Sequence, residues 1–221
     1  MKKVVIIGAG GMGREVLDVI DACNQVNRVY EPLGFIVDIQ FGAPGTMINE
    51  RPILGGFDWL EHRVDDIYVI CGVGGSHLRY QLIQRAESLN CRFINLIHPS
   101  VILSRQISIG EGNVITAGCI LTNHIQIGNH VIVNLSCTIG HDASLQNFVT
   151  MGQGVHVSGN VTLGTGCYIG TGTNIVEKIH VGEWSIIGAG SAIIRNIPAN
   201  TTVVGVPGRV IKEREARWYL K

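Results

Sequence analysis

Residues 127–145 read IGNHVIVNLSCTIGHDASL, and a large aliphatic residue occupies every sixth position of this stretch. The same spacing extends in both directions without an exception, and a glycine often follows the aliphatic residue. The full series is Ile97, Leu103, Ile109, Ile115, Leu121, Ile127, Val133, Ile139, Leu145, Met151, Val157, Leu163, Ile169, Ile175, Val181, Ile187 and Ile193. A six-residue period matches neither the repeat of an α-helix, about 3.6 residues, nor the two-residue alternation of a flat sheet.

This period predicts a triangular solenoid in which each side is a short strand and a turn, so that three sides, or about 18 residues, complete a coil. The aliphatic residues then stack inward, and the coils lie at the spacing of paired strands, about 4.8 Å. Cys119, Cys137 and Cys167 all stand two residues before an aliphatic position, and the six cysteines contain no Cys-x-x-Cys pair. We therefore interpret these three cysteines as packing residues and expect no metal site. The extent of the repeat assigns residues 97–221 to a β-helix with a C-terminal cap.

Residues 1–96 follow a different pattern, in which strand-like and helix-like segments alternate. The strand-like segments are 3–10, 33–38, 66–74 and 91–97, and the helix-like segments are 12–23 and 76–89. This alternation predicts a small α/β domain, a parallel sheet with helices packed on it. The stretch 40–56 is rich in glycine and proline and is predicted to be a loop.

Composition narrows the classes of function. Lys and Arg together number 17, as do Asp and Glu, so the chain has no net positive charge that would favour binding to nucleic acid or to an acidic membrane. No apolar run reaches the length of a membrane helix, about 18 residues. The apolar start of the chain is short and is followed at once by Arg14 and Glu15, which favours a buried strand over a signal peptide. We therefore expect a cytoplasmic protein.

A glycine motif follows the first predicted strand. Gly8, Gly10 and Gly13 fit the pattern Gly-x-Gly-x-x-Gly, which lets the backbone at Gly8, Gly10 and Gly11 approach a phosphate at a helix N-terminus. Asp38 ends the second strand, where a carboxylate can accept a hydrogen bond from a ribose or a base. Since residues 1–96 have room for one mononucleotide-binding half, we expect a nucleotide-sugar here rather than a dinucleotide.

A second glycine turn, GVGGSHLR at 72–79, precedes the second predicted helix. We expect Gly74, Ser76 and Arg79 to lie near the diphosphate of the same ligand. The alternative for both turns is a tight glycine cluster that binds nothing.

His141 and Asp142 form an unusual pair within the solenoid, because Asp142 is the only Asp, Glu, Lys or Arg between Glu111 and Glu177. Histidine is the best general base near neutral pH, and a carboxylate that accepts its other N–H fixes the tautomer. Adjacent side chains of a regular strand point apart, so this pair must lie at a bend. We predict that His141 is a general base oriented by Asp142, and we interpret His124, His130 and His180 as surface or turn residues.

The whole chain resembles the bacterial sugar acyltransferases related to sialic acid O-acetyltransferases and nucleotide-sugar N-acetyltransferases. The stretches that carry the resemblance are IGAGGMGREV at 7–16, GFIVD at 34–38, CGVGGSHLR at 71–79, HPS at 98–100, IGHDAS at 139–144, SGNVTLG at 158–164 and VGVPGRVI at 204–211. The resemblance implies a Rossmann-like domain followed by a left-handed β-helix, acetyl-CoA as the acyl donor, and a homotrimer.

The resemblance also implies roles for single residues. Asn134, seven residues before His141, is expected to help hold the acceptor, and Gly159, one coil after His141, to bind the thioester oxygen through its N–H. Many relatives carry a second histidine nine residues after the first, where this chain has Thr150, whose hydroxyl can donate a similar hydrogen bond. The positions expected to lie along CoA are Thr150, Gly159, Thr171, Ala189 and Arg209.

We therefore predict an acetyl-CoA-dependent N-acetyltransferase that acts on a nucleotide-linked amino sugar in surface glycan synthesis. O-acetylation of a sialic acid or a similar sugar is an alternative within the same class. A non-catalytic nucleotide-sugar-binding protein is a third reading, against which the His141–Asp142 pair argues. A nicotinamide-dependent oxidoreductase is a fourth, against which the short N-terminal domain argues.

Overall fold

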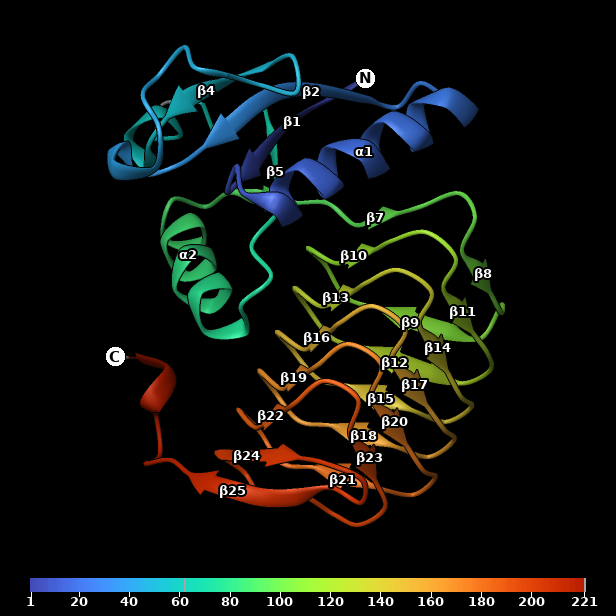
Figure 1. Ribbon diagram of the computed structural model, residues 1–221. Coiled ribbons are helices and arrows are strands. Elements are labelled where there is room, and N and C mark those ends of the chain that lie inside the picture. The colour runs from blue at the N-terminus through green and yellow to red at the C-terminus, as the bar shows by residue number, and fades with distance from the viewer. Residues whose placement is uncertain (62, 221) are drawn as a thin grey trace.

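The computed structural model describes residues 1–61 and 63–220, which form an N-terminal α/β domain and a solenoid, with the domain lying at the first-coil end of the solenoid (Figure 1). The N-terminal domain contains the strands β1 (Lys2–Ile7), β2 (Tyr30–Ile36), β3 (Met47–Ile48), β4 (Arg51–Gly55), β5 (Tyr68–Cys71) and β6 (Arg92–Phe93). Its helices are α1 (Gly11–Val26) and α2 (Ser76–Ser88), with the 3-10 turns η1 (Ile39–Phe41) and η2 (Phe57–Trp59). Val4 and Ile6 of β1 pack with α1, whereas Val5 and Ile7 pack on the other side with Ile83 of α2.

The N-terminal sheet has the order β3-β4-β2-β1-β5-β6 and is parallel except for the β3–β4 pair. The expectation that 40–56 is a loop is wrong for β3 and β4. Ile53 of β4 pairs with Phe35 of β2, and both side chains are buried. Pro52 and Gly55 lie within this short strand and concealed it, because proline and glycine are depleted in strands.

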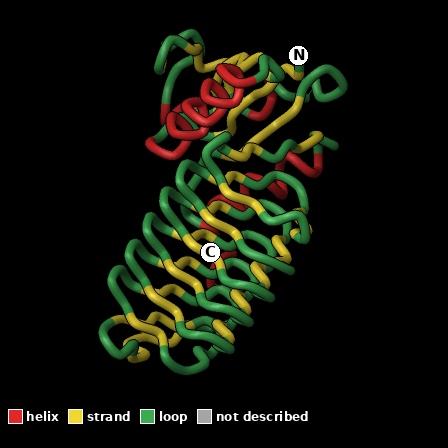
Figure 2. The backbone as a smooth tube through the Cα atoms, turned by 90° about the vertical axis from the view of Figure 1, so that its right-hand side faces the viewer, coloured by secondary structure: helices red, strands yellow, loops and turns green. Residues whose placement is uncertain are grey.

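The solenoid is built from short parallel strands on three faces, which Figure 2 shows in rows along its length. The domain face, on which the N-terminal domain packs, contains β7 (Leu96–Ile97), β10 (Val114–Ile115), β13 (Ile132–Val133), β16 (Thr150–Met151), β19 (Tyr168–Ile169), β22 (Ile186–Ile187), β24 (Thr201–Val204) and the antiparallel β25 (Arg209–Glu213). The second face contains β8 (Ile102–Leu103), β11 (Ile120–Leu121), β14 (Thr138–Ile139), β17 (His156–Val157), β20 (Asn174–Ile175) and β23 (Ala192–Ile193). The third face contains β9 (Ile107–Ile109), β12 (Ile125–Ile127), β15 (Ser144–Leu145), β18 (Thr162–Leu163) and β21 (His180–Val181).

The sixfold aliphatic series forms the solenoid core, as predicted. Every member from Ile115 to Ile193 is buried, together with Cys119, Cys137 and Cys167. Leu103, in the first coil, is 38% exposed, because that coil has a neighbouring coil on one side only. The register between coils is regular, with each strand residue paired to the residue 18 positions away.

The three corners of the solenoid are tight turns whose central residues have positive φ, and equivalent residues recur every 18 positions. The outer corner, between the second and third faces, holds His124, Asp142, Asn160 and Lys178 at these positions. The α1 corner, between the domain and second faces, holds Gly118, Ser136, Gly154, Gly172 and Gly190. The α2 corner, between the third and domain faces, holds Gly112, His130, Phe148, Gly166 and Trp184.

The N-terminal domain packs on the first coils of the domain face. The outward side chains Leu96, Val114 and Ile132 are fully buried in one cluster with Val16 and Ile20 of α1. On the other side, α2 lies along the α2 corner, where Tyr80 contacts both Phe148 and Trp184 edge to face. The outer corner is therefore the part of the triangle opposite the N-terminal domain.

Past β25 the chain returns to α2 and forms the 3-10 turn η3 (Trp218–Leu220). Tyr219 stacks on Trp184 with ring centroids 3.7 Å apart, and Gln81 of α2 donates a hydrogen bond to the Tyr219 carbonyl. Within the described residues, no helix is long and apolar enough to cross a membrane.

Candidate active site

His141 and Asp142 lie together in a turn of the outer corner, between β14 and β15. Asp142 has φ 59°, and this left-handed bend brings two adjacent side chains to the same side of the chain. His141 Nδ1 and Asp142 Oδ2 are 2.7 Å apart, and the Asp142 amide donates to the Asn123 carbonyl of the preceding coil. Both side chains are about half exposed, at 63% and 49%. With Nδ1–H held by the carboxylate, the lone pair of Nε2 is free to accept a proton.

Gly159 lies in the next coil under the His141 ring. A Cβ atom at Gly159 would stand 2.6 Å from His141 Nε2 and 2.7 Å from Cε1, closer than carbon and nitrogen atoms pack. The turn is anchored by the Asn160 amide, which donates to the His141 carbonyl at 2.8 Å. The absence of a side chain at Gly159 therefore leaves the space that the His141 imidazole occupies.

The glycine motif and Asp38 meet at one cavity of about 510 Å³ in the N-terminal domain. Gly8 has φ 95°, and a Cβ on Gly13 would stand 2.0 Å from the Gly8 carbonyl oxygen, so the turn and the start of α1 pack as only glycines allow. Gly10 and Gly11 face open space. The cavity is lined by Ile7, Gly8, Ala9, Gly10, Ile36, Val37, Asp38, Gln40, Phe41, Ile48, Phe57, Val73, Leu78 and Leu82.

Asp38 has a partner that the sequence reasoning missed. Arg85 of α2 forms an ion pair with Asp38 at 3.3 Å and stacks over the Phe57 ring at 4.0 Å. Arg85 and Asp38 also line a second, more open groove of about 720 Å³ beyond η2. Arg85 lies in the last turn of α2, away from any sequence motif, so no local signal marked it.

Three expected ligand residues are instead buried where the domains meet. The Arg79 side chain is 1% exposed and donates to the carbonyls of Val73, Gly74, His130, Phe148 and Val149 and to the Thr150 hydroxyl. The Thr150 hydroxyl donates to the Gly74 carbonyl at 2.8 Å and accepts from Ser76 Oγ at 3.1 Å.

The expected roles of these residues are therefore corrected. Arg79 and Ser76 have no surface to offer a diphosphate, and Thr150 is 2% exposed, with its hydroxyl already donating to the Gly74 carbonyl. Burial lowers the pKa of Arg79 to about 10, which leaves its guanidinium charged at neutral pH. Gly74, the fourth residue of this group, keeps open space around its Cα.

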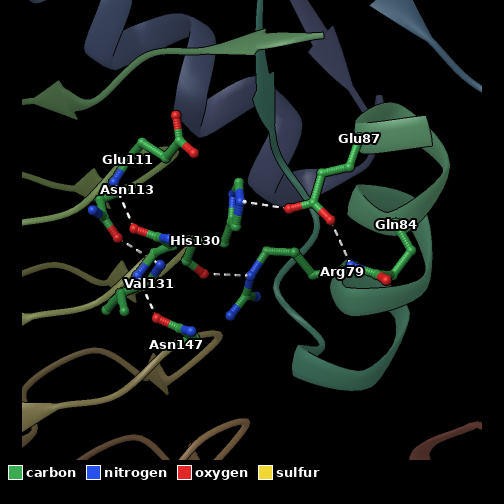
Figure 3. A network of polar contacts seen from close by, with 9 residues as sticks. Arg79, Gln84, Glu87, Glu111, Asn113, His130, Val131 and Asn147 are labelled. Atoms are coloured by element: carbon green, nitrogen blue, oxygen red, sulfur yellow. Dashed lines mark hydrogen bonds and ion pairs between the residues drawn. The ribbon is translucent and has the colours of Figure 1, made fainter. Parts of the chain in front are cut away.

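His130 belongs to the same contact and is not a surface residue (Figure 3). Its side chain is 2% exposed, stacked on Phe148 at 5.2 Å and edge-on to Phe93 at 4.7 Å. Its Nε2 lies 3.8 Å from Glu87 Oε1, too far for a hydrogen bond. Burial lowers the pKa of His130 to about 4, and the charge of Arg79 acts in the same direction.

The remaining expected ligands lie away from the outer corner. Asn134 is at the α1 corner, 7% exposed, and its Oδ1 is buried without a hydrogen-bond partner among the described residues. Thr171 and Ala189 are exposed at the same corner, two and three coils further on, and Arg209 is exposed at the start of β25. One chain thus brings His141 and Gly159 together, but not with the other expected CoA contacts.

Comparison with known proteins places the chain in a family. It is 31% identical to the acetyltransferase domain of PglB from Neisseria gonorrhoeae FA1090, solved in complex with acetyl coenzyme A, with a TM-score of 0.87 over 95% of this chain and 99% of that one. The chain belongs to the bacterial sugar acetyltransferase family. Residues 3–86 also match the family described as the PglD N-terminal domain.

Other members of the acetyltransferase family agree with this assignment. PerB from Caulobacter crescentus, solved in complex with CoA and GDP-perosamine, is 25% identical, with a TM-score of 0.86 over 96% of this chain and 98% of PerB. The UDP-N-acetylbacillosamine N-acetyltransferase of Bacillus subtilis (strain 168) is 34% identical over 127 residues, which are 53% of this chain and about half, 52%, of that protein. The predicted fold class, a Rossmann-like domain followed by a left-handed β-helix, is confirmed.

Proposed function

We propose that the chain transfers an acetyl group from acetyl-CoA to the amino group of a nucleotide-linked sugar, with His141 as the general base. The observation that carries this proposal is the His141–Asp142 contact of 2.7 Å on an exposed corner, above a glycine that leaves the ring its space. The relatives named above are N-acetyltransferases or were solved with acetyl-CoA or with CoA and a nucleotide-sugar, which favours an amine over a hydroxyl acceptor. We place the reaction in the cytoplasm, where acetyl-CoA is available.

The proposed chemistry follows from the free Nε2 of His141. The sugar amine attacks the thioester carbonyl, an N–C bond forms, and the nitrogen loses a proton to Nε2. The C–S bond then breaks, and the imidazolium returns the proton to the CoA thiolate. Asp142 holds the ring in the required tautomer and stabilises the imidazolium, while the Gly159 N–H is proposed to meet the developing oxyanion.

A single chain does not complete this site, so we propose a homotrimer. The nucleotide cavity lies in the domain packed on the domain face, whereas His141 lies at the outer corner opposite that face. If the outer corner of one copy meets the α1 corner of the next, His141 and Gly159 come to face Asn134, Thr171 and Ala189. The second face, which joins these two corners, exposes Ile102 by 61% and Ile120 by 40%, apolar surface suited to burial against a copy.

The activity is tested by thiol release from acetyl-CoA against a panel of UDP-, GDP- and dTDP-linked amino sugars. Turnover with at least one of them is expected, and His141→Ala is expected to lower kcat by about 10²- to 10⁴-fold, the usual range for a general base. Asp142→Asn is expected to lower kcat by a smaller factor. Acceptance of hydroxy sugars only, or normal turnover by His141→Ala, would contradict the proposal.

The assembly is tested separately. Sedimentation should report about three times the chain mass of 23.9 kDa. Mixing inactive His141→Ala with an inactive Asn134→Ala variant should restore activity if the two residues serve one site from different chains. An active monomer would refute the shared site.

A further inference from the structure

Helix α2 forms a wall between the nucleotide cavity and the solenoid. Leu78 and Leu82 on one side of the helix line the cavity. Arg79 and Glu87 point the other way, toward the turn that carries His130 (Figure 3). The position of the cavity wall therefore depends on how α2 is seated on the solenoid.

Arg79 joins three separate segments of backbone through one guanidinium group. Nη1 donates to Val73 at 2.9 Å and Gly74 at 3.0 Å, in the turn before α2. Nε donates to His130 at 2.9 Å. Nη2 donates to Phe148 at 2.8 Å, one coil further along the α2 corner. Among the described residues, every hydrogen-bond partner of this guanidinium is a carbonyl or hydroxyl oxygen, and none is a carboxylate.

This arrangement is unusual for a contact that serves stability alone. A buried charge without an ion-pair partner is costly, and apolar side chains of similar volume often replace buried charged groups without loss of stability. Apolar packing, however, fixes no direction, whereas the planar fork of arginine holds several acceptors in one fixed geometry. The turn held in this way contributes Val73 to the nucleotide cavity.

We propose that Arg79 is a positioning residue for nucleotide-sugar binding, which holds the 72–75 turn and the start of α2 in register with the solenoid that carries the general base. This inference rests on the proposed function. It assigns Arg79 no contact with substrate. Its loss should loosen the wall of the cavity and leave the CoA-binding part of the solenoid unaffected.

The helix has a second attachment, which is independent of Arg79. Tyr80 packs edge to face on Tyr219, and Gln81 donates to the Tyr219 carbonyl, so the C-terminal turn also holds α2. The apolar residues Ile83 and Ala86 are buried in the N-terminal core. A substitution of Arg79 by lysine is thus expected to leave the fold intact and to disturb the glycine turn.

Direct binding to the full chain tests the inference. Calorimetric titrations with UDP, GDP and dTDP, and separately with CoA, compare the wild type with Arg79→Lys, which keeps the charge and loses the fork. Arg92→Lys is the matched control, since Arg92 also donates to backbone carbonyls, those of Asp65 and Ile67, but does not line the cavity. We expect Arg79→Lys to weaken nucleotide binding about tenfold and to leave CoA binding and the control unchanged. In turnover, the KM for the nucleotide-sugar should rise while the KM for acetyl-CoA stays the same.

The possible outcomes separate the two claims. If the wild type binds CoA but no nucleotide, the proposed function fails and the inference fails with it. If the wild type binds a nucleotide and Arg79→Lys binds it equally well, the inference is refuted and the proposed function stands. Equal loss of nucleotide and CoA binding in Arg79→Lys would also refute it, because Arg79 would then support the fold as a whole.

Discussion

Replacing His130 by phenylalanine should make the protein more resistant to acid. His130 is buried between aromatic rings, and the groups that face it are the charged Arg79, the Glu87 carboxylate 3.8 Å away and the Glu111 backbone carbonyl, which accepts from its amide. Burial lowers the pKa of this histidine from 6.5 to about 4. The unfolded chain therefore binds a proton at His130 more readily than the folded chain does.

The sign and size of the effect follow from proton linkage. Because the pKa of His130 is lowered by folding, the contribution of His130 to the free energy of unfolding is complete above about pH 6.5 and is lost as the pH falls toward about 4. Each unit of pKa difference corresponds to about 1.4 kcal/mol, so the wild type should lose about 2 kcal/mol between pH 7 and pH 5 from this residue. His130→Phe removes that loss.

Phenylalanine is a suitable replacement because Phe148 occupies the equivalent position one coil on, with φ 61° against 57° at His130. The assay is urea unfolding at pH 7 and at pH 5, compared between the wild type and His130→Phe. His124→Phe is the matched control, because His124 has the same backbone conformation, φ 56°, but is exposed. If the free energy of unfolding falls equally between pH 7 and pH 5 in the wild type and in His130→Phe, the assigned burial and titration of His130 are refuted.

Two further substitutions probe the candidate site. Gly159→Ala should lower kcat, because the new Cβ would stand 2.6 Å from His141 Nε2, and it should have little effect on stability. Added to His141→Ala, the same substitution should lower kcat no further, and this double-mutant cycle isolates the contact between the two residues. Asp38→Ala should raise the KM for the nucleotide-sugar and leave the KM for acetyl-CoA unchanged in steady-state kinetics, since Asp38 lines the nucleotide cavity; a change in acetyl-CoA affinity instead would show that this cavity holds the other substrate.

The parts of the site that were predictable from the sequence rest on local features. His141 and Asp142 are adjacent, and Asp142 is the only Asp, Glu, Lys or Arg between Glu111 and Glu177, so their contact needed only a bend in the chain. The Gly8–Gly13 turn packs against itself within six residues. A signal for the domain contact was also present, because the outward positions Leu96, Val114 and Ile132 are apolar at 18-residue spacing.

Arg79, Ser76 and Thr150 could not be placed in this way. Arg79 follows a glycine turn that has the pattern of a phosphate site, yet its guanidinium contacts backbone 51 and 69 residues further along the chain. Likewise, nothing in the sequence around His130 distinguishes it from the exposed His124, which has the same turn conformation.

The sequence by itself determined the solenoid, because a period of six is a property of one segment and every coil repeats the same inward contact. It also determined the glycine turn and the His141–Asp142 pair, whose geometry depends on neighbours in the chain. Only the tertiary structure decided which polar residues face ligand and which are buried, since that depends on where the N-terminal domain docks on the triangle. Arg79 and His130 are buried by that docking, whereas His141 stays exposed because its corner lies on the opposite side.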